Sequence, residues 1–339
     1  MPAEPMGMES LFDDLLGQPR AVVLLSAALE KRRIAPAYLF AGPEGVGRRL
    51  AALRFLEGVI GPGAPGDAGP AVLRRRLAQG NHPDLLWLEP TYLHQGRLVR
   101  ASEAEAEGVS RRTAPQIRLE QVRDVARFLA RHPVEAPGPL VVIESVESMA
   151  EGAANALLKT LEEPGEGLLL LISAAPEQLL STIHSRCQQI PFVRLRPQTV
   201  EQVLARPHQQ VLARQAGAGP LTLADPADPP ELLELAAGSP GALLEHRRRW
   251  RELPEGLATR LLELRAEPLE ALALARDLCE ALEGEQQLWL LSWWQLARWR
   301  RGGAAADLRR LERLRSQLRA FVQPRLAWEV ALLELSGLA

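Results

Sequence analysis

The amino-acid sequence predicts an α/β fold with a parallel sheet in its first half, and helices alone in its second half. Two observations lead to this prediction. Short apolar strand patterns alternate with helical patterns from Phe12 to about Phe192, and strand patterns mostly end after Pro191. Strands that alternate with helices of this length are typical of a doubly wound sheet.

The first half contains a series of short strand patterns separated by helical patterns. The expected strands are Ala37–Ala41, Leu85–Leu88, Leu140–Glu144, Leu168–Ser173 and a short one at Gln188–Phe192. The expected helices are Arg20–Arg33, Arg48–Val59, Ile117–Arg131 and Ala153–Glu163. Two interruptions are expected to be surface loops, because one is rich in glycine and proline and the other is polar: Gly61–Pro70 and Ala101–Pro115.

The second half is rich in leucine, alanine, arginine and glutamate at helical spacing. Helices are expected at Thr199–Gln215 and Pro230–Trp250, separated by the turn-rich segment Ala216–Pro230. Several packed helices are expected from Arg251 onward. The sequence therefore predicts an α/β domain at residues 1–192, a small helical domain at 193–250 and a C-terminal helical domain at 251–339.

Composition argues against several classes of protein. The 339 residues carry a net charge of −2, so the chain as a whole does not attract nucleic acid. The two cysteines, Cys187 and Cys279, can form neither a disulfide framework nor a four-cysteine zinc site. The sequence has no apolar run of about 20 residues and no signal-peptide pattern, so we expect a cytoplasmic protein without a membrane span.

A glycine-rich turn follows the first predicted strand. Gly42, Gly45 and Gly47 match the glycines of a phosphate-binding loop, whose backbone N–H groups cradle phosphates at the start of a helix. The lysine position of this loop is Arg48, and the position of the hydroxyl that binds Mg²⁺ is Arg49. Because an arginine has no acceptor atom and repels a metal cation, we interpret the turn as a degenerate nucleotide loop.

A second departure lies at the end of the strand Leu140–Glu144. An active site of this kind places an acidic pair there, which ligates Mg²⁺ and polarises the attacking water. Here the first position is Glu144 and the second is Ser145, which is no base at neutral pH. The two departures predict that the chain does not hydrolyse ATP. We expect no tightly bound cofactor, and whether ATP binds without hydrolysis stays open.

Several motifs resemble those of bacterial clamp-loader proteins of the AAA+ class. In chain order they are Gln18-Pro19, the loop at 42–49, His82-Pro83-Asp84, Asn155–Pro164 and Ser185-Arg186-Cys187. The resemblance covers about residues 10–192, is weaker at Gly238–Gly241, and beyond that is one of helical composition. It implies an AAA+ P-loop domain, then a small helical lid domain and a C-terminal helical collar domain.

The resemblance also implies a role. Clamp loaders are ATP-driven rings that place the sliding clamp on primed DNA for a replicative polymerase, and the arginine of the Ser-Arg-Cys motif reaches the ATP site of a neighbouring subunit. Arg186 is therefore expected to act as an arginine finger in trans. The implied partners are gamma/tau-like motor subunits and a delta-like subunit, with the clamp and primed DNA contacted through the complex. ATPase activity is expected in the partners rather than in this chain.

The sequence departs from the family pattern in three further places. Many members carry a four-cysteine zinc module before the His-Pro-Asp motif, but residues 57–81 contain no cysteine and carry Arg74-Arg75-Arg76, so we expect no zinc. Motor subunits place a nucleotide-sensing arginine after a Gly-Ser pair, whereas Pro240 and Gly241 stand there. The second sensor position is Ser173 or Ala174, a weak version of that sensor.

Other reactive or aromatic residues have simpler interpretations. His82 and Asp84 lack a third metal ligand, so a structured turn is expected, and His184 and Cys187 lack the partners of a nucleophilic site. Core packing is expected for four tryptophans, with a subunit interface as the alternative: Trp289, Trp293, Trp294 and Trp299. The arginines at 247–249 and at 298, 300 and 301 are expected on solvated helix faces, with DNA contact an alternative for 74–76 and 247–249.

Two other functions stay open at this point. One is an ATP-hydrolysing motor subunit of the same loader, against which Arg48, Arg49 and Ser145 argue. The other is a stand-alone DNA-binding repair factor with an AAA+ relic, against which the near-zero net charge argues.

Overall fold

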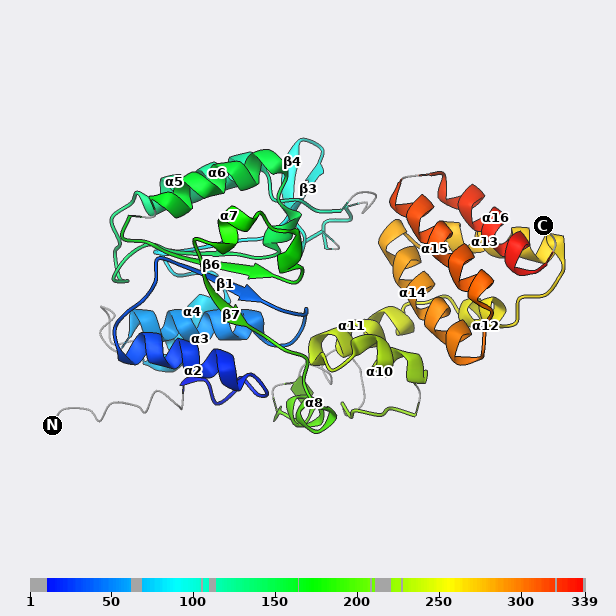
Figure 1. The fold of residues 1–339 in the computed structure, drawn as a ribbon, viewed down its shortest axis with the longest axis horizontal. Helices are drawn as coiled ribbons and strands as arrows, with labels where there is room; N and C mark the ends of the chain where they lie inside the picture. Colours follow the sequence, from blue (N-terminus) through cyan, green and yellow to red (C-terminus); the bar gives the residue numbers. More distant parts are fainter. Residues whose placement is uncertain are drawn as a thin grey trace. The chain divides into compact units, whose positions relative to one another are not determined.

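The computed structural model describes residues 11–61, 69–104, 106–109, 114–163, 165–207, 209–210, 221–226, 228–320 and 322–337. These form two compact units, each considered by itself (Figure 1). Unit 1 comprises the described parts of Met1–Glu107, Pro115–Leu223 and Gly238–Gly241, and unit 2 those of Gly108–Ala114, Ala224–Ala237 and Ala242–Ala339. The three-domain division of the sequence stays a prediction, because these units are defined by compactness alone.

Parts of the predicted loops and of the Asn155–Pro164 motif lie outside the described residues. They are 62–68 of the first predicted loop, 105 and 110–113 of the second, Pro164, and 208, 211–220 and 227 in the predicted lid region.

Unit 1 is built on a five-stranded parallel sheet. Its strands are β1 (Ala37–Ala41), β2 (Leu85–Leu88), β5 (Leu140–Ile143), β6 (Leu168–Ser173) and β7 (Gln188–Pro191), in the order β2-β5-β6-β1-β7. The central strands are apolar and almost fully buried, as expected where helices cover both faces of a parallel sheet. All five strands predicted from the sequence are confirmed.

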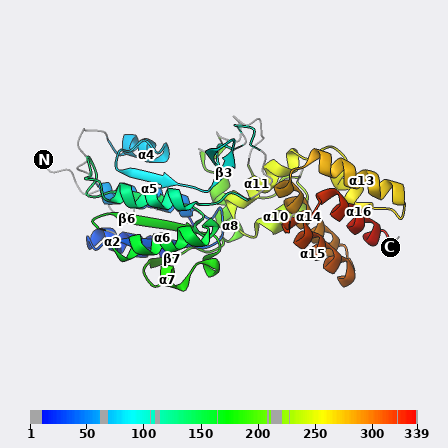
Figure 2. The same cartoon turned by 90° about the horizontal axis from the view of Figure 1, so that it is seen from above.

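Helices cover both faces of this sheet (Figures 1 and 2). On one face lie α2 (Pro19–Glu30), α3 (Arg48–Ile60) and α4 (Pro70–Ala78), and on the other α5 (Leu119–Leu129) and α6 (Glu151–Glu162). Two 3₁₀ turns, η1 (Val146–Ser148) and η2 (Pro176–Gln178), and the helices α7 (Ser181–His184) and α8 (Pro197–Leu204) also belong to the unit.

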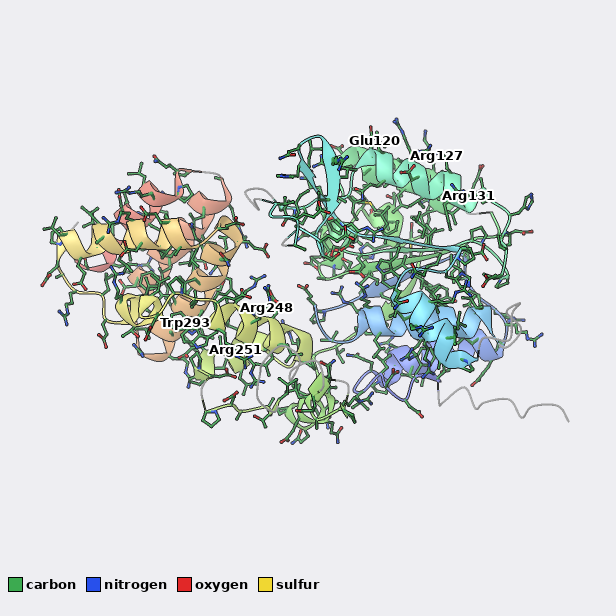
Figure 3. All side chains as sticks on the ribbon, turned by 180° about the vertical axis from the view of Figure 1, so that it is seen from behind. Glu120, Arg127, Arg131, Arg248, Arg251 and Trp293 are labelled. Atoms are coloured by element: carbon green, nitrogen blue, oxygen red, sulfur yellow. The ribbon has the colours of Figure 1, made fainter. Side chains whose placement is uncertain are left out.

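Helix α5 illustrates how the sequence determines which face of a helix is buried. Val122 and Val125 point into the core, while Glu120, Arg127 and Arg131 lie on the solvent side (Figure 3). Apolar residues three apart on one face, with charges opposite, are the pattern of a half-buried helix.

Unit 1 also contains elements that the sequence did not predict. A two-stranded antiparallel hairpin joins β3 (Thr91–His94) to β4 (Arg97–Arg100), and α4 and α7 are further additions. The hairpin turns at Gln95 and Gly96, both with positive φ, which is the backbone of a tight two-residue turn.

Unit 2 is helical. Its helices are α10 (Pro230–Ala236), α11 (Pro240–Arg251, whose first two residues count with unit 1), α12 (Leu257–Leu262), α13 (Pro268–Ala281), α14 (Gly284–Arg300), α15 (Ala305–Arg319) and α16 (Pro324–Leu335). The single helical stretch predicted at Pro230–Trp250 is wrong, because Ala237 and Gly238 adopt positive φ and end α10. No helix among the described residues has the length and apolar character to span a membrane.

The core of unit 2 is rich in tryptophan. Trp289, Trp293 and Trp294 are buried, which confirms the core interpretation for them, but Trp299 is 61% exposed and does not fit it. The predicted basic clusters are largely paired with carboxylates of the same unit: Arg247 with Asp228, Arg248 and Arg249 with Glu245, Arg298 with Asp307 and Arg300 with Glu234.

Candidate functional site: the two edges of the sheet

The phosphate loop follows the carboxyl end of β1. Gly42, Gly45 and Gly47 all adopt positive φ, and α3 begins at Arg48 directly after them. Glycine is required at position 42, because a Cβ atom there would clash with the carbonyl oxygen of Phe192. The local backbone is therefore that of a loop wrapped around a helix N-terminus, as the sequence predicted.

Arg49 and Glu144 form an ion pair inside this site. The Arg49 Nη1 atom lies 2.9 Å from Glu144 Oε1, and the guanidinium also stacks over the Trp87 ring at 4.8 Å. The same carboxylate oxygen accepts a 2.7 Å hydrogen bond from Trp87 Nε1. Burial raises the pKa of Glu144, and Arg49 and Trp87 oppose that rise. The carboxylate in the metal-ligand position is thus paired with the side chain that replaces the metal-binding hydroxyl.

Arg48 lies buried beside this pair. It is 8% exposed, its Nη1 atom has no hydrogen-bond partner in the described structure, and burial lowers its pKa against the opposing carboxylates of Glu147, Glu44 and Glu144. At the two candidate sensor positions, Ser173 is fully buried and its Oγ has no hydrogen-bond partner among the residues that the structure describes, while the Ala174 N–H donates to Glu147 Oε1 at 3.0 Å. Ser145 adopts positive φ at the start of η1.

These residues do not fit Mg²⁺. A magnesium ion needs oxygen ligands in octahedral geometry, usually a carboxylate and a hydroxyl in a loop of this kind. Here the hydroxyl is missing and the carboxylate holds a cationic side chain. The site can offer positive charge and backbone N–H groups to an anion, but no place for a metal.

Two distant segments hold the loop. The buried side chain of Gln18 donates to the carbonyls of Val46 (3.2 Å) and Val193 (2.7 Å) and accepts from the Val193 N–H (3.0 Å). Ser239 Oγ donates to the Glu44 carbonyl at 2.6 Å, and the Gly241 N–H donates to the Gly45 carbonyl at 3.1 Å. Gly241 must lack a side chain, because a Cβ there would lie 2.7 Å from Gly45 Cα. The Gln-Pro and Gly-Ser-Pro-Gly motifs therefore act as clamps on the loop.

Arg186 lies at the opposite end of the strands, at the edge of the sheet where the parallel strands begin (the amino edge), whereas the loop lies where they end (the carboxyl edge). It follows α7 and precedes β7, and β7 pairs in parallel with β1 from Tyr38↔Gln188 to Ala41↔Pro191. The loop leaves the carboxyl end of β1, whereas Arg186 approaches the amino end of β7. At about 3.3 Å per residue, the five residues of β1 put roughly 15 Å or more between the two.

The residues around Arg186 are fixed by contacts within the chain. His184 engages both ring nitrogens, Nε2 with the Pro176 carbonyl at 2.7 Å and Nδ1 with Gln189 Nε2 at 2.9 Å. Cys187 packs against the core, and burial raises the pKa of its thiol to about 12, so it is no nucleophile at neutral pH. Arg186 itself is exposed, and its Nη2 lies 2.7 Å from Glu162 Oε1.

The His-Pro-Asp motif forms a structural turn, as expected. The Asp84 carboxylate accepts three backbone hydrogen bonds, from Val134 (2.8 Å), Glu135 (2.6 Å) and Ala136 (2.8 Å). Burial opposes ionisation, but these donors lower the pKa of Asp84. His82 is buried, and burial lowers its pKa.

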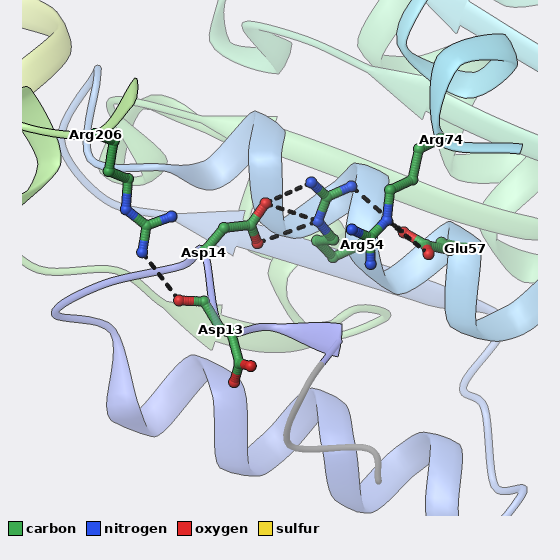
Figure 4. A network of polar contacts seen from close by, with 6 residues as sticks. All are labelled: Asp13, Asp14, Arg54, Glu57, Arg74 and Arg206. Atoms are coloured by element: carbon green, nitrogen blue, oxygen red, sulfur yellow. Dashed lines mark hydrogen bonds and ion pairs between the residues drawn. The ribbon is translucent and has the colours of Figure 1, made fainter. Parts of the chain in front are cut away.

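A network of ion pairs occupies the region between α3 and α4 (Figure 4). Arg54 binds Asp14 and Glu57, and Arg74 Nε lies 2.8 Å from Glu57, whose side chain is 5% exposed. Arg76 reaches Glu135 at 2.8 Å. Two of the three arginines at 74–76 are thus used within unit 1. In the part of the chain that the structure describes, no three His, Cys, Asp or Glu side chains are grouped so that they could hold a metal ion.

The structure brings together most, but not all, of the predicted site residues. The loop residues 42–49 and Glu144–Ser145 form one cluster, and Ser185–Cys187 lie apart from it. Sequence reasoning missed Trp87 and Glu162. Trp87 lies one residue before the end of β2, which pairs with β5, the strand directly before Glu144, and this position was a usable signal for the first.

Two family models match the chain. One, described as "DNA polymerase III, delta subunit", matches residues 17–196, and the other, "Cyanobacterial DNA polymerase III delta prime, C-terminal domain", matches residues 198–335. The DNA polymerase III subunit delta' of Bacillus subtilis is 34% identical over 188 residues, which are 54% of this chain and 50% of that protein. The subunit delta' of Pseudomonas aeruginosa is 40% identical over 158 residues, 46% of this chain and 42% of that protein. The matched segment thus spans half or less of the length of these relatives.

A solved structure shares the fold. The crystal structure of a DNA polymerase III gamma subunit-related protein from Thermotoga maritima is 17% identical, with a TM-score of 0.50 over 94% of this chain and 99% of that one. At this identity the likeness concerns the fold alone. It confirms the predicted fold class, an α/β domain with a parallel sheet followed by helices.

Proposed function

The chain belongs to the DNA polymerase III delta-prime family, and from this premise we propose that it is a non-hydrolysing subunit of a clamp loader. In this role it helps place the sliding clamp on primed DNA and supplies Arg186 to the ATP site of a neighbouring subunit. Its partners are gamma/tau-like motor subunits and a delta-like subunit, and the clamp and DNA are contacted through the complex.

The position of Arg186 carries the proposal. Its side chain is exposed and lies at the opposite edge of the sheet from the chain's own phosphate loop. An arginine side chain extends only about 7 Å, about half of the roughly 15 Å that β1 spans. Arg186 therefore cannot serve its own loop, and an ATP bound to another subunit is the substrate that it can reach.

The chemistry of phosphoryl transfer explains why an arginine is used. Negative charge develops on the γ-phosphate oxygens, and a guanidinium in a preformed position stabilises that charge with two parallel N–H donors. Fingers supplied in trans raise the rate by about 10³ to 10⁵. A lysine offers one compact charge and no planar fork, so it is a poor replacement.

The Arg49–Glu144 pair supports the non-hydrolysing part of the proposal. In the described loop the Mg²⁺-binding hydroxyl is replaced by Arg49, Glu144 is paired with Arg49, and Ser145 stands at the position of the base, so these residues argue against the motor-subunit alternative. We further propose that the chain folds without zinc, with the Arg54–Glu57–Arg74 network bracing α3 and α4.

The test is a reconstituted clamp loader that carries Arg186→Ala. We expect the ring to assemble, DNA-stimulated ATP turnover to fall partially, because only one site depends on this chain, and clamp loading to slow. Arg186→Lys should rescue poorly, and Arg20→Ala, a substitution of another exposed arginine of unit 1, should leave turnover unchanged. Wild-type rates with Arg186→Ala would overturn the trans role.

A further inference from the structure

The Arg186 side chain is held by the chain that carries it. Its Nη2 donates to Glu162 Oε1 at 2.7 Å, and its Nη1 donates to the Thr182 carbonyl at 3.1 Å and lies 3.5 Å from Ser185 Oγ. A guanidinium has five N–H donors in a planar fork. Within the described part of the chain these contacts use at most three of them, which leaves two N–H groups for another acceptor.

The backbone on both sides of Arg186 is already fixed. His184 ties the segment to Pro176 and Gln189, and Cys187 is anchored in the core. The remaining freedom lies in the arginine side chain, which has several rotatable bonds and a large rotamer entropy. Glu162 is the charged group that restricts it.

Glu162 is itself well placed for this task. It is the last residue of α6, a helix anchored by buried Leu157 and Leu161. The carbonyl groups at the end of a helix carry partial negative charge, which adds to the attraction for a guanidinium nearby. The pair is half exposed, with 35% and 53% of the two side chains accessible, so it orients the arginine without neutralising it as a buried pair would.

We propose that Glu162 is a positioning residue for Arg186, which holds the guanidinium so that its free N–H groups face the partner's phosphates. This inference rests on the proposed trans role of Arg186. Two effects of the carboxylate oppose each other: it pre-orders the side chain, and its charge repels the partner's phosphates. We infer that ordering prevails, because the repulsion acts across solvent and is screened by salt.

The experiment compares Glu162→Ala and Glu162→Gln in the reconstituted clamp loader, with Glu163→Ala as the matched control on the exposed neighbouring residue. The quantity measured is the Arg186-dependent turnover, which is the wild-type rate minus the rate with Arg186→Ala. Glu162→Ala should lower it by about 3- to 10-fold through kcat, with little change in the KM for ATP. Glu162→Gln keeps an acceptor oxygen and should lie between, and Glu163→Ala should match wild type.

The same substitutions in the Arg186→Ala background distinguish a failure of the positioning role of Glu162 from a failure of the proposed trans role of Arg186. Glu162→Ala should have no further effect there, because its partner is gone. An equal loss in that background, a faster rate with Glu162→Ala, or a change in KM alone would overturn the positioning role. Wild-type turnover with Arg186→Ala would instead overturn the proposed function. Melting temperature and assembly of each variant show whether it is folded.

Discussion

The charged residues at the two edges of the sheet in unit 1 differ in how they are paired and exposed. At the carboxyl edge, Arg49 and Glu144 neutralise each other, and Arg48 is buried next to them. At the amino edge, Arg186 is exposed, and the carboxylate that pairs with it, that of Glu162, is half exposed. Both edges carry motifs of ATP chemistry. The difference teaches that charges paired with each other offer little to a bound ligand, whereas an exposed charge remains accessible to another chain.

The largest expected effect concerns the carboxyl edge, where the phosphate loop lies. The purified chain should hydrolyse ATP at least about 10³-fold more slowly than a competent motor subunit, because the Mg²⁺-binding hydroxyl and the base are replaced and the Glu144 carboxylate is paired with Arg49. The measurement is steady-state ATP turnover of the single chain with Mg²⁺. Metal-dependent turnover that Arg48→Ala abolishes would break the comparison.

The second effect concerns Asp84, a charged residue at the amino edge whose carboxylate is used within its own unit and is not accessible to another chain. Asp84→Asn should destabilise the protein by about 2 to 3 kcal/mol, because the asparagine side chain presents an NH₂ group where a backbone N–H needs an acceptor. The pKa of Asp84 is lowered by folding, so its contribution is present above a pH of about 4 and is lost as the pH falls through the folded value. Urea unfolding at pH 7 measures the loss.

The control for Asp84→Asn is the rate of ATP turnover by the partner subunits in the assembled clamp loader. It should be unchanged under conditions in which the variant is folded, since the Asp84 carboxylate accepts hydrogen bonds from backbone of its own unit. A selective loss of turnover in a fully folded variant would contradict the structural role.

The third effect probes the internal pair itself. Arg49→Ala should destabilise the protein by about 1 kcal/mol at pH 7, because a partly exposed pair contributes little and Glu144 loses its cation. The pKa of Glu144 is already raised by burial and should rise further in the variant. A carboxyl group whose pKa is higher in the folded state stabilises the fold at pH values below its unfolded-state pKa. This stabilisation is lost as the pH rises through its folded-state pKa. The difference from wild type should therefore shrink as the pH falls below the pKa of Glu144.

Unfolding at pH 7 and again in mild acid checks this sign. The double variant Arg49→Ala with Glu144→Gln should recover most of the lost stability, since no uncompensated carboxylate is left. A loss of stability that is the same at both pH values would show that Arg49 acts through packing on Trp87 rather than through charge.

The smallest expected effect is that of metal removal. Chelators should leave the melting temperature unchanged, and elemental analysis should find less than one zinc per chain. The reason is that ion pairs brace α3 and α4, and residues 57–81 offer no cysteine. One tightly held zinc per chain would contradict this.

The strands were predictable because buried parallel strands are continuous apolar runs, as in Leu168–Ser173. The loop was predictable because only glycines permit its backbone. The hairpin at residues 91–100 was missed, since its strands are four residues long and its outward Leu93 and Leu98 blur the alternation.

The site was predictable as a set of residue types but not as a set of partners. The sequence identified Arg49 and Glu144 as two separate departures, 95 residues apart, whereas their pairing depends on how β1 and β5 are brought together. Glu162 lies within the Asn155–Pro164 motif, but the motif did not indicate that this glutamate pairs with Arg186. Its importance lies in a contact with a residue 24 positions later.

The clamps on the phosphate loop have a consequence for synthesis of the protein on the ribosome. Ser239 reaches back 195 residues to the Glu44 carbonyl, and Gln18 binds Val193 across 175 residues. Contacts of such long sequence separation form late in folding, and chains fold progressively as they emerge. The loop region therefore cannot reach its final form until residue 241 has left the ribosome, long after the strands of the sheet have been made. A nascent chain arrested before that point would lack the contacts that Ser239 and Gly241 make with the loop.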